Sequence, residues 1–133
     1  MKKLLQCVIL LVLPCLVVST AFGRKIKVPK HYPTIQAGID AASNGDTVMV
    51  ANGTFTGSGN RDIDFGGKAI TVQSVGGPEY CIIDAEGEGP GFYFHSGEGE
   101  NSVLSGFTIT GGYANLPLYY GGGICIENNS SPT

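Results

Sequence analysis

The sequence predicts an all-β solenoid, in which short parallel strands stack coil upon coil, preceded by one short capping helix. Glycine makes up 21 of the 133 residues, well above the average of about 7%, and it separates many short apolar runs. No helical pattern follows residue 46. Runs of roughly three to six residues fit either a solenoid or an antiparallel sandwich. Irregular spacing between the runs and few two-residue hairpin turns favour the solenoid, whose loops project outward at the corners.

The capping helix is predicted to begin after Pro33. Thr34 can accept a hydrogen bond from an N–H of the first turn and so act as the N-cap. The apolar residues on one face, at helical spacing, are Ile35, Ile39 and Ala42. Asn44-Gly45 should end the helix after about two to three turns, because glycine accepts the left-handed conformation found there. The apolar face would cover the open end and strand edge of the first coil.

The predicted strands follow the helix, after a basic lead-in over residues 24–30. They comprise residues 47–50, 63–65, 69–74, 81–84, 91–95, 103–110 and 124–126. Gly66-Gly67 and Gly76-Gly77-Pro78 are typical of turns between them. Several runs alternate apolar with polar residues, which places one face of each strand in a core.

The first 23 residues have the order of a secretory signal. Lys2 and Lys3 precede an apolar run over residues 4–18, and small residues lead to Gly23, where we expect cleavage. An uncleaved membrane anchor is the alternative, but the run is short for a membrane span. We therefore expect a signal peptide (1–23), a lead-in strand with the capping helix (24–46) and β-helix coils (47–133). The protein is expected to be secreted, extracellular or in the cell envelope, with no stable membrane span after cleavage.

The charge balance argues against nucleic acid as a partner. Loss of Lys2 and Lys3 with the signal would change the formal charge from −3 to −5. So acidic a chain lacks the basic patch that phosphate backbones require. Two cysteines, Cys81 and Cys125, would remain after cleavage. Export would allow a disulfide between them, and the alternative is two buried thiols on inner faces.

Particular segments resemble a known family. Residues 32–42 (YPTIQAGIDAA), 44–48 (NGDTV) and 53–55 (GTF) closely resemble the N-terminal cap of pectin-lyase-like right-handed parallel β-helix proteins. Gly38 stands where that family usually has alanine, at a cost in helix propensity of about 1 kcal/mol. Residues 106–112 (GFTITGG) and 121–124 (GGGI) resemble repeats of bacterial and chlamydial outer-membrane β-helix proteins. The resemblance covers residues 28–133 and is specific for the fold, not for the function.

The resemblance implies a right-handed parallel β-helix with a ladder of inward side chains. The expected inward pairs are Val48/Val50, Ile70/Val72, Ile82/Ile83, Phe92/Phe94, Phe107/Ile109 and Ile124/Ile126. The length allows about three to four coils, and each coil needs a neighbour on both sides. Because no polar cap precedes Thr133, we expect the chain to be a truncated part of a longer β-helix.

Enzymes of this superfamily act on acidic polysaccharides, and their activity needs carboxylates that converge on one face. Asp62 and Asp64 lie two apart on a predicted strand and would share a face. The simpler interpretation places both on the solvated outer face. The acidic run Asp84, Glu86 and Glu88 could supply oxygen ligands to calcium, although glycine-rich acidic runs are also ordinary turns. We therefore predict no catalytic residue and no required cofactor within this chain.

The loop between residues 112 and 121 is the longest insertion in the latter half. Its tyrosines and amide could form a platform on which sugars stack: Tyr113, Asn115, Tyr119 and Tyr120. The alternative is a loop that folds its own apolar residues onto the solenoid wall. Three functions remain open: a binding or adhesion scaffold for polysaccharide or cell-surface glycan, the N-terminal part of a polysaccharide-active enzyme, and a purely structural repeat. We prefer the first.

Overall fold

The structure, a computed structural model, describes residues 22–114 and 122–133 of the chain. Most of the predicted signal segment therefore lies outside the described residues. Among the described residues, no helix has both the length and the apolar character that a membrane crossing requires.

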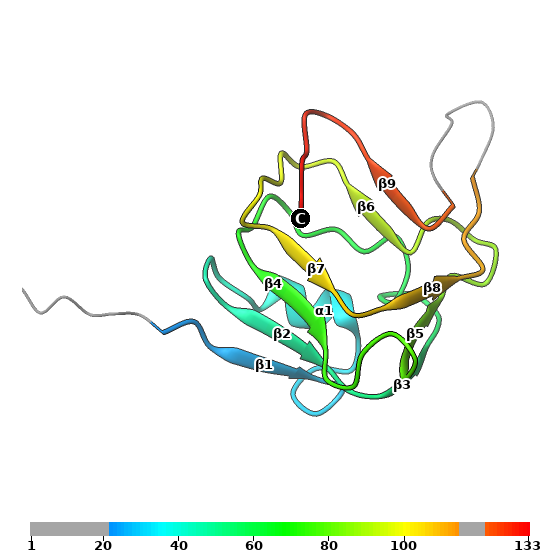
Figure 1. The fold of residues 1–133 in the computed structure, drawn as a ribbon, viewed down its shortest axis with the longest axis horizontal. Helices are drawn as coiled ribbons and strands as arrows, with labels where there is room; N and C mark the ends of the chain where they lie inside the picture. Colours follow the sequence, from blue (N-terminus) through cyan, green and yellow to red (C-terminus); the bar gives the residue numbers. More distant parts are fainter. Residues whose placement is uncertain (1–21, 115–121) are drawn as a thin grey trace, which may run out of the picture.

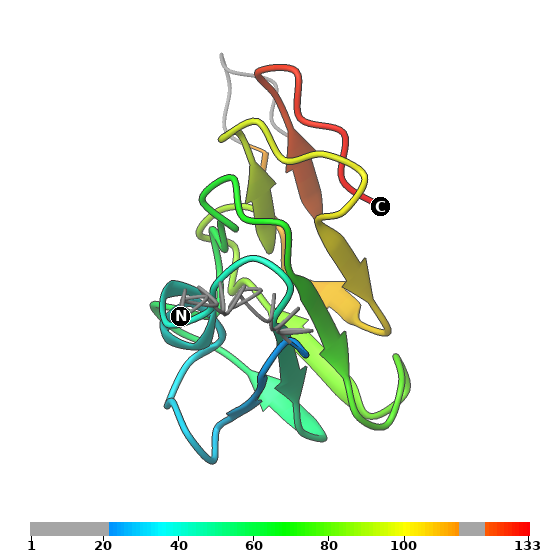
Figure 2. The ribbon, with the colours of Figure 1, turned by 90° about the vertical axis from the view of Figure 1, so that its left-hand side faces the viewer.

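Three parallel sheets form the sides of a β-solenoid of about three turns (Figure 1, Figure 2). The first sheet has the order β1 (Lys25–Val28), β2 (Thr47–Val50), β4 (Thr71–Ser74) and β7 (Val103–Ser105). The second consists of β3 (Gly53–Phe55), β5 (Cys81–Asp84) and β8 (Thr108–Thr110). The third pairs β6 (Phe92–Phe94) with β9 (Ile124–Ile126). Every strand pair is parallel, which confirms the predicted solenoid and excludes the sandwich.

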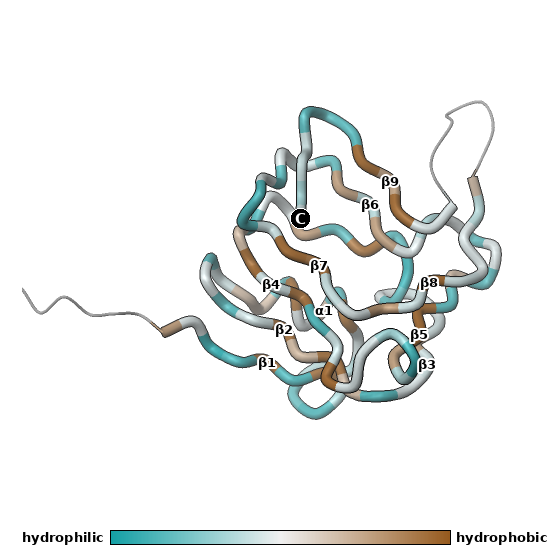
Figure 3. The backbone as a smooth tube through the Cα atoms, viewed as in Figure 1, coloured by the Kyte–Doolittle hydropathy of each residue, from teal (hydrophilic) through white to brown (hydrophobic). Residues whose placement is uncertain are grey.

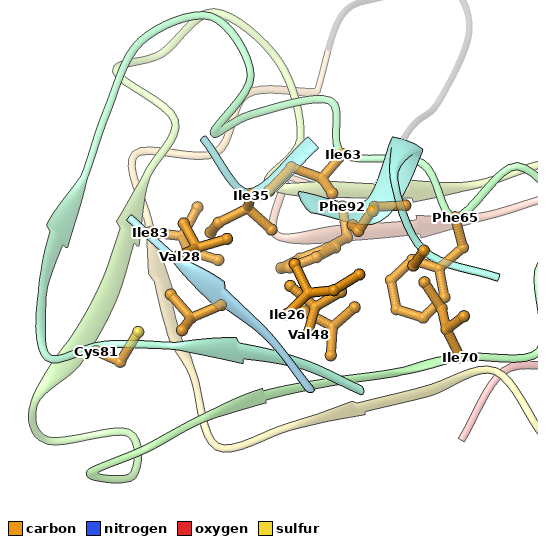
Figure 4. Close-up of a cluster of buried hydrophobic side chains, with 14 of the residues drawn as sticks. Ile26, Val28, Ile35, Val48, Ile63, Phe65, Ile70, Cys81, Ile83 and Phe92 are labelled. Atoms are coloured by element: carbon orange, nitrogen blue, oxygen red, sulfur yellow. The ribbon is translucent and has the colours of Figure 1, made fainter. Parts of the chain in front are cut away.

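Inward side chains from the three sheets meet in one apolar core (Figure 4). Ile26, Val48 and Val72 occupy equivalent positions on successive strands of the first sheet, and all three are buried. On the third side, Phe92 lies in register with Ile63 through an isolated parallel bridge. Burial of each such side chain contributes about 1.5–3 kcal/mol, so stacking holds the coils together.

Two of the predicted strands are shortened or divided in the structure, because the chain turns at glycines at the corners of the solenoid. Residues 63–65 form only the bridge at Ile63, and the chain turns at Gly66 and Gly67, whose φ angles are 64° and 75°. The run over residues 103–110 divides into β7 and β8 at Gly106, with φ of 82°. The Gly106 carbonyl accepts a hydrogen bond from the Ser74 hydroxyl of the coil below. A side chain at residue 106 would collide with that hydroxyl, so glycine is required there.

The predicted ladder is confirmed for most inward pairs, but Ile82 lies on the other face, and Ile124 and Ile126 are exposed instead of buried. In β5 the buried residues are Cys81 and Ile83, so Ile82 faces outward and is half-buried. Ile124 and Ile126 are in register with Phe92 and Phe94, yet they are 43% and 52% exposed. They belong to the last coil, where no further described coil covers them.

The helix α1 (Ile35–Asp40) closes the other end of the core. Thr34 caps it as predicted, since its hydroxyl accepts a hydrogen bond from the Ala37 N–H at 3.2 Å. The predicted apolar face is buried: Ile35, Ile39 and Ala42. With six residues the helix is shorter than predicted. Lys68 Nζ donates to the carbonyls of Ile39 and Asp40, which replaces the bonds that a further helical turn would supply.

Gly38 has a packing role that the sequence did not reveal. A β-carbon at this position would lie 2.8 Å from a methyl group of Val28 and 3.2 Å from one of Val48. The helix therefore approaches β1 and β2 more closely than alanine would allow. The loss of helix propensity at Gly38 is offset by this contact.

Asp46 fixes the connection between α1 and β2. Its carboxylate accepts hydrogen bonds from the backbone N–H of Ser43 at 2.9 Å and of Arg24 at 2.7 Å. The Arg24 guanidinium adds a bond at 2.9 Å. These contacts lower the pKa of Asp46 from an ordinary value of 3.8 to about 2.

We expect the stability of the protein to fall as the pH is lowered from about 4 to about 2. The depressed pKa means that the contribution of Asp46 is fully present above its unfolded pKa and is lost as the pH falls through the folded value. Urea unfolding at a series of pH values measures this effect. Asp46→Asn should be less stable at pH 7 and should show a shallower acid dependence. An unchanged acid dependence in Asp46→Asn would show that other carboxylates cause it.

Candidate functional site

Polar side chains line the outer surface of the third side of the solenoid. Asp64 lies between Ile63 and Phe65, and both of these neighbours are fully buried. Tyr93 lies in the same way between Phe92 and Phe94 in β6. Because side chains of an extended chain alternate between faces, Asp64 and Tyr93 stand on the outside of adjacent coils.

His95 connects these two residues. Its Nε2 lies 3.4 Å from Oδ2 of Asp64, and its ring lies 4.1 Å from the Tyr93 ring, measured between centroids. The Tyr93 hydroxyl donates a hydrogen bond of 2.7 Å to the carboxylate of Glu127, which follows β9. The Ser96 hydroxyl donates to Asp64 at 3.1 Å. We call these five residues the outer polar row: Asp64, Tyr93, His95, Ser96 and Glu127.

The outer polar row spans all three coils and remains accessible to solvent. The side chains of His95 and Asp64 are 35% and 26% exposed, so both are held in place without being shielded. Asn128 Nδ2 donates to the His95 carbonyl at 3.2 Å and fixes the turn that carries it. The row therefore presents two carboxylates, an imidazole and a phenol ring at defined positions.

The directions of the hydrogen bonds within the outer polar row suit ligand binding better than nucleophilic catalysis. A hydroxyl nucleophile needs a hydrogen bond to its base, which a third group then orients. Ser96 instead donates directly to the Asp64 carboxylate. Carboxylates that accept hydrogen bonds beside an aromatic surface are the groups that orient a sugar.

The backbone conformation at Asp62 separates the two residues of the predicted acidic pair, Asp62 and Asp64. Asp64 belongs to the outer polar row, whereas Asp62 has a left-handed φ of 50° and lies outside any strand. The strand alternation on which their shared face depended is therefore absent at Asp62. Its carboxylate lies beside Gly89, where a β-carbon would come within 2.7 Å of it.

The predicted calcium ligands have other contacts in the structure. Glu86 accepts hydrogen bonds from the Arg61 guanidinium at 2.7 Å and from the Gly57 N–H at 2.9 Å. Glu88 lies 3.7 Å from the same guanidinium, and Asp84 accepts a bond from the Glu86 N–H at 2.9 Å. Within residues 22–114 and 122–133, no three His, Cys, Asp or Glu side chains are placed to hold a metal ion.

Only one member of the predicted tyrosine platform can be located. Tyr113 is 52% exposed, and its N–H donates to the Gly89 carbonyl at 3.0 Å. Asn115, Tyr119 and Tyr120 lie outside the described residues. The platform stays a prediction.

The two cysteines are buried thiols and are not bonded to each other. Cys81 points into the core from β5, as Figure 4 shows, and Cys125 lies in β9 in register with Tyr93. Burial raises the pKa of the Cys81 thiol to about 11, which makes it a poor nucleophile. The structure contains no disulfide between the two cysteines, and only Cys81 lies on the inner face that the alternative placed both on.

Tyr93, His95 and Glu127 were not predicted as site residues. His95 looked isolated in the sequence because it has no nearby histidine, and Glu127 lies 34 residues after Tyr93. Only the register between β6 and β9 brings them together. No protein-family model, curated protein or solved structure is significantly similar to this chain.

Proposed function

We propose that this chain is a secreted or cell-surface β-solenoid module of the adhesion type that binds glycans and has no catalytic site of its own. The observation that carries the proposal is the outer polar row, a set of fixed polar groups that crosses all three coils. The signal-like order of residues 1–23 supports export.

The geometry of the outer polar row is suited to a sugar ring. The Tyr93 and His95 rings, 4.1 Å apart and inclined by 38°, offer an aromatic surface against which the apolar face of a sugar can pack. Carboxylate oxygens of Asp64 and Glu127 lie on either side of these rings and can accept hydrogen bonds from sugar hydroxyls. A solenoid holds such groups rigidly, so little conformational entropy is lost on binding.

We expect Tyr93→Ala to weaken glycan binding about 10-fold or more, since it removes the ring surface and releases Glu127. An array of immobilised neutral and acidic oligosaccharides identifies the best ligand, and isothermal titration calorimetry with that oligosaccharide measures the change. Tyr93→Phe keeps the ring and loses the bond to Glu127, so its effect should be smaller.

Tyr80→Ala is the matched control. Tyr80 is 58% exposed and lies in the turn between β4 of the first sheet and β5 of the second, whereas the outer polar row lies on the third side. Its loss should change the affinity by less than about twofold. Equal losses in the two variants, or no binding to any glycan by the parent protein, would contradict the proposal.

A second candidate is the N-terminal part of a polysaccharide-active enzyme. It is favoured by the resemblance to pectin-lyase-like proteins and by the Asp64–His95 pair, in which a carboxylate faces an imidazole at 3.4 Å. The assay is turnover of polygalacturonate and alginate, with calcium, by the secreted product. Turnover that Asp64→Asn abolishes would replace the binding module with the enzyme.

A further inference from the structure

A groove of about 430 Å³ lies on the outer face of the first sheet, whereas the outer polar row lies on the third side of the solenoid. Strands β1 and β2 and the residues that follow β1, β2 and β4 line it. Its lining residues are Lys25, Lys27, Val28, Pro29, Lys30, Met49, Ala51 and Val75. This volume falls in the range of small-molecule sites, about 300–1,000 Å³.

The register of the first sheet explains why the floor of the groove is apolar. Lys27 and Met49 are partners in the parallel pair β1–β2, and they alternate with buried residues, so both face outward. The ladder continues beyond the strands, because the Ala51 N–H donates to the Val28 carbonyl and the Val75 N–H to the Val50 carbonyl. Ala51 and Val75 therefore lie side by side on the floor, and Val75 is 64% exposed.

Three lysines line the groove beside this floor, and none of them forms an ion pair within the part of the chain that the structure describes. Among the described residues, no carboxylate lies within ion-pair distance of Lys25, Lys27 or Lys30. All three side chains are exposed. By contrast, two other basic residues have partners within the protein. Arg61 pairs with two glutamates, and Lys68 donates hydrogen bonds to backbone carbonyls at the end of α1.

The charge of the groove opposes that of the whole molecule. The chain carries a formal charge of −3, whereas the groove is lined by three lysines and by no acidic residue. Cations beside an apolar floor complement a molecule that has an anionic head and an apolar body. In Figure 3 the largely hydrophilic strand β1 and the hydrophobic strand β9 lie at opposite ends of the solenoid.

The strand edge beside the groove is closed to an added peptide strand. β1 is the edge strand of its sheet, and its outward N–H and C=O groups at Lys27 are both occupied by His31. The His31 Nδ1 accepts from the Lys27 N–H at 3.1 Å, and the His31 N–H donates to the Lys27 carbonyl at 2.7 Å. A ligand must therefore bind to the face of the sheet and not to its edge.

We propose that this groove binds a small amphiphilic anion, an alkyl carboxylate whose head contacts the lysines and whose chain lies on Met49, Ala51 and Val75. The inference is independent of glycan binding at the outer polar row, because the two surfaces share no residue.

The test is a titration of the isotopically labelled protein with decanoate at pH 7, below the micelle concentration. The chain contains two methionines, Met1 and Met49, so the Met49 methyl resonance is readily assigned and reports directly on the floor. We expect decanoate to shift this resonance with saturation. Lys27→Gln should weaken binding about 5- to 10-fold and Val75→Asp about 10-fold or more.

Two controls separate this site from other apolar surfaces. Ile126→Asp changes a second apolar hollow of about 120 Å³ that has no lysine in its lining, and it should leave the decanoate affinity within about twofold. Decyltrimethylammonium, with the same chain and the opposite charge, should bind at least about 10-fold more weakly. Equal binding of both amphiphiles, loss of binding in Ile126→Asp, or binding to phosphatidylglycerol vesicles without binding to monomeric decanoate would overturn the proposal.

Discussion

Replacing Glu98 with alanine should lower the free energy of unfolding by about 3 kcal/mol or more. Glu98 is only 1% exposed although it carries a carboxylate. Its Oε1 accepts a hydrogen bond from the Gly67 N–H at 3.0 Å, and its Oε2 accepts from the Ser96 N–H at 3.0 Å and the Ser130 hydroxyl at 2.8 Å. Each buried donor left without a partner costs about 1–3 kcal/mol.

The position of Glu98 in the solenoid makes the effect large. Gly67 belongs to the first coil, Ser96 to the second and Ser130 to the third, so one carboxylate connects all three at the same corner. Burial acts to raise the pKa of Glu98, but the hydrogen bonds from the three coils outweigh it and hold the pKa below its usual value. This carboxylate is therefore ionised at neutral pH, and its charge is balanced by hydrogen-bond donors, since no cation of the described residues lies within ion-pair distance of it.

Urea unfolding followed by circular dichroism measures the change. Glu98→Gln keeps the size of the side chain but directs an amide N–H₂ toward donors, so it should also destabilise the protein. Glu100→Ala is the matched control, because Glu100 is an exposed glutamate two residues away and should change the stability by less than about 0.5 kcal/mol. A Glu98→Ala protein as stable as Glu100→Ala would show that the corner does not depend on this carboxylate.

Phe65→Ala should destabilise the protein by about 3–5 kcal/mol, since it removes a fully buried ring and leaves a cavity. The Phe65 ring meets Phe94 edge to face, with centroids 4.9 Å apart, and Phe92 at 6.4 Å. All three aromatic side chains are buried between the first and second coils. The cavity would therefore open inside the stack where the coils depend on each other.

Thermal and urea unfolding of three variants tests this prediction. Phe65→Leu retains most of the volume and should cost about 1–2 kcal/mol. Phe107→Ala removes the same atoms from a half-buried position, so it should cost less than Phe65→Ala. If the loss were the same at both phenylalanines, burial in the stack could not be its cause.

Patterns of local spacing were enough to predict most of the strands, although β3 (Gly53–Phe55) was not among them. Alternation of apolar and polar residues placed Ile70, Val72 and Phe92 in the core, and the residues at the start of the helix identified Thr34 as its N-cap. These features depend on neighbours within a few residues, which the sequence displays directly. The helix length was wrong because its end is set by Lys68, 28 or more residues away.

Contacts between coils could not be predicted in the same way. The loops at the corners differ in length, so the sequence gives no fixed interval from which to derive the register. The resemblance placed both Ile82 and Ile83 inward, and only the pairing of β5 with β3, in which Ile83 lies beside Phe55, shows which of the two is buried.

The sequence alone was enough to predict most of the strands, the start of the helix, and the stacking of the strands in a solenoid. These properties follow from side-chain periodicity and turn chemistry, which act over a few residues. The tertiary structure alone decided that Asp64, His95 and Glu127 form one surface, that Glu98 connects three coils, and that three lysines share an apolar groove. Each of these depends on which residues of successive coils lie in register, a long-range relation that no local pattern records.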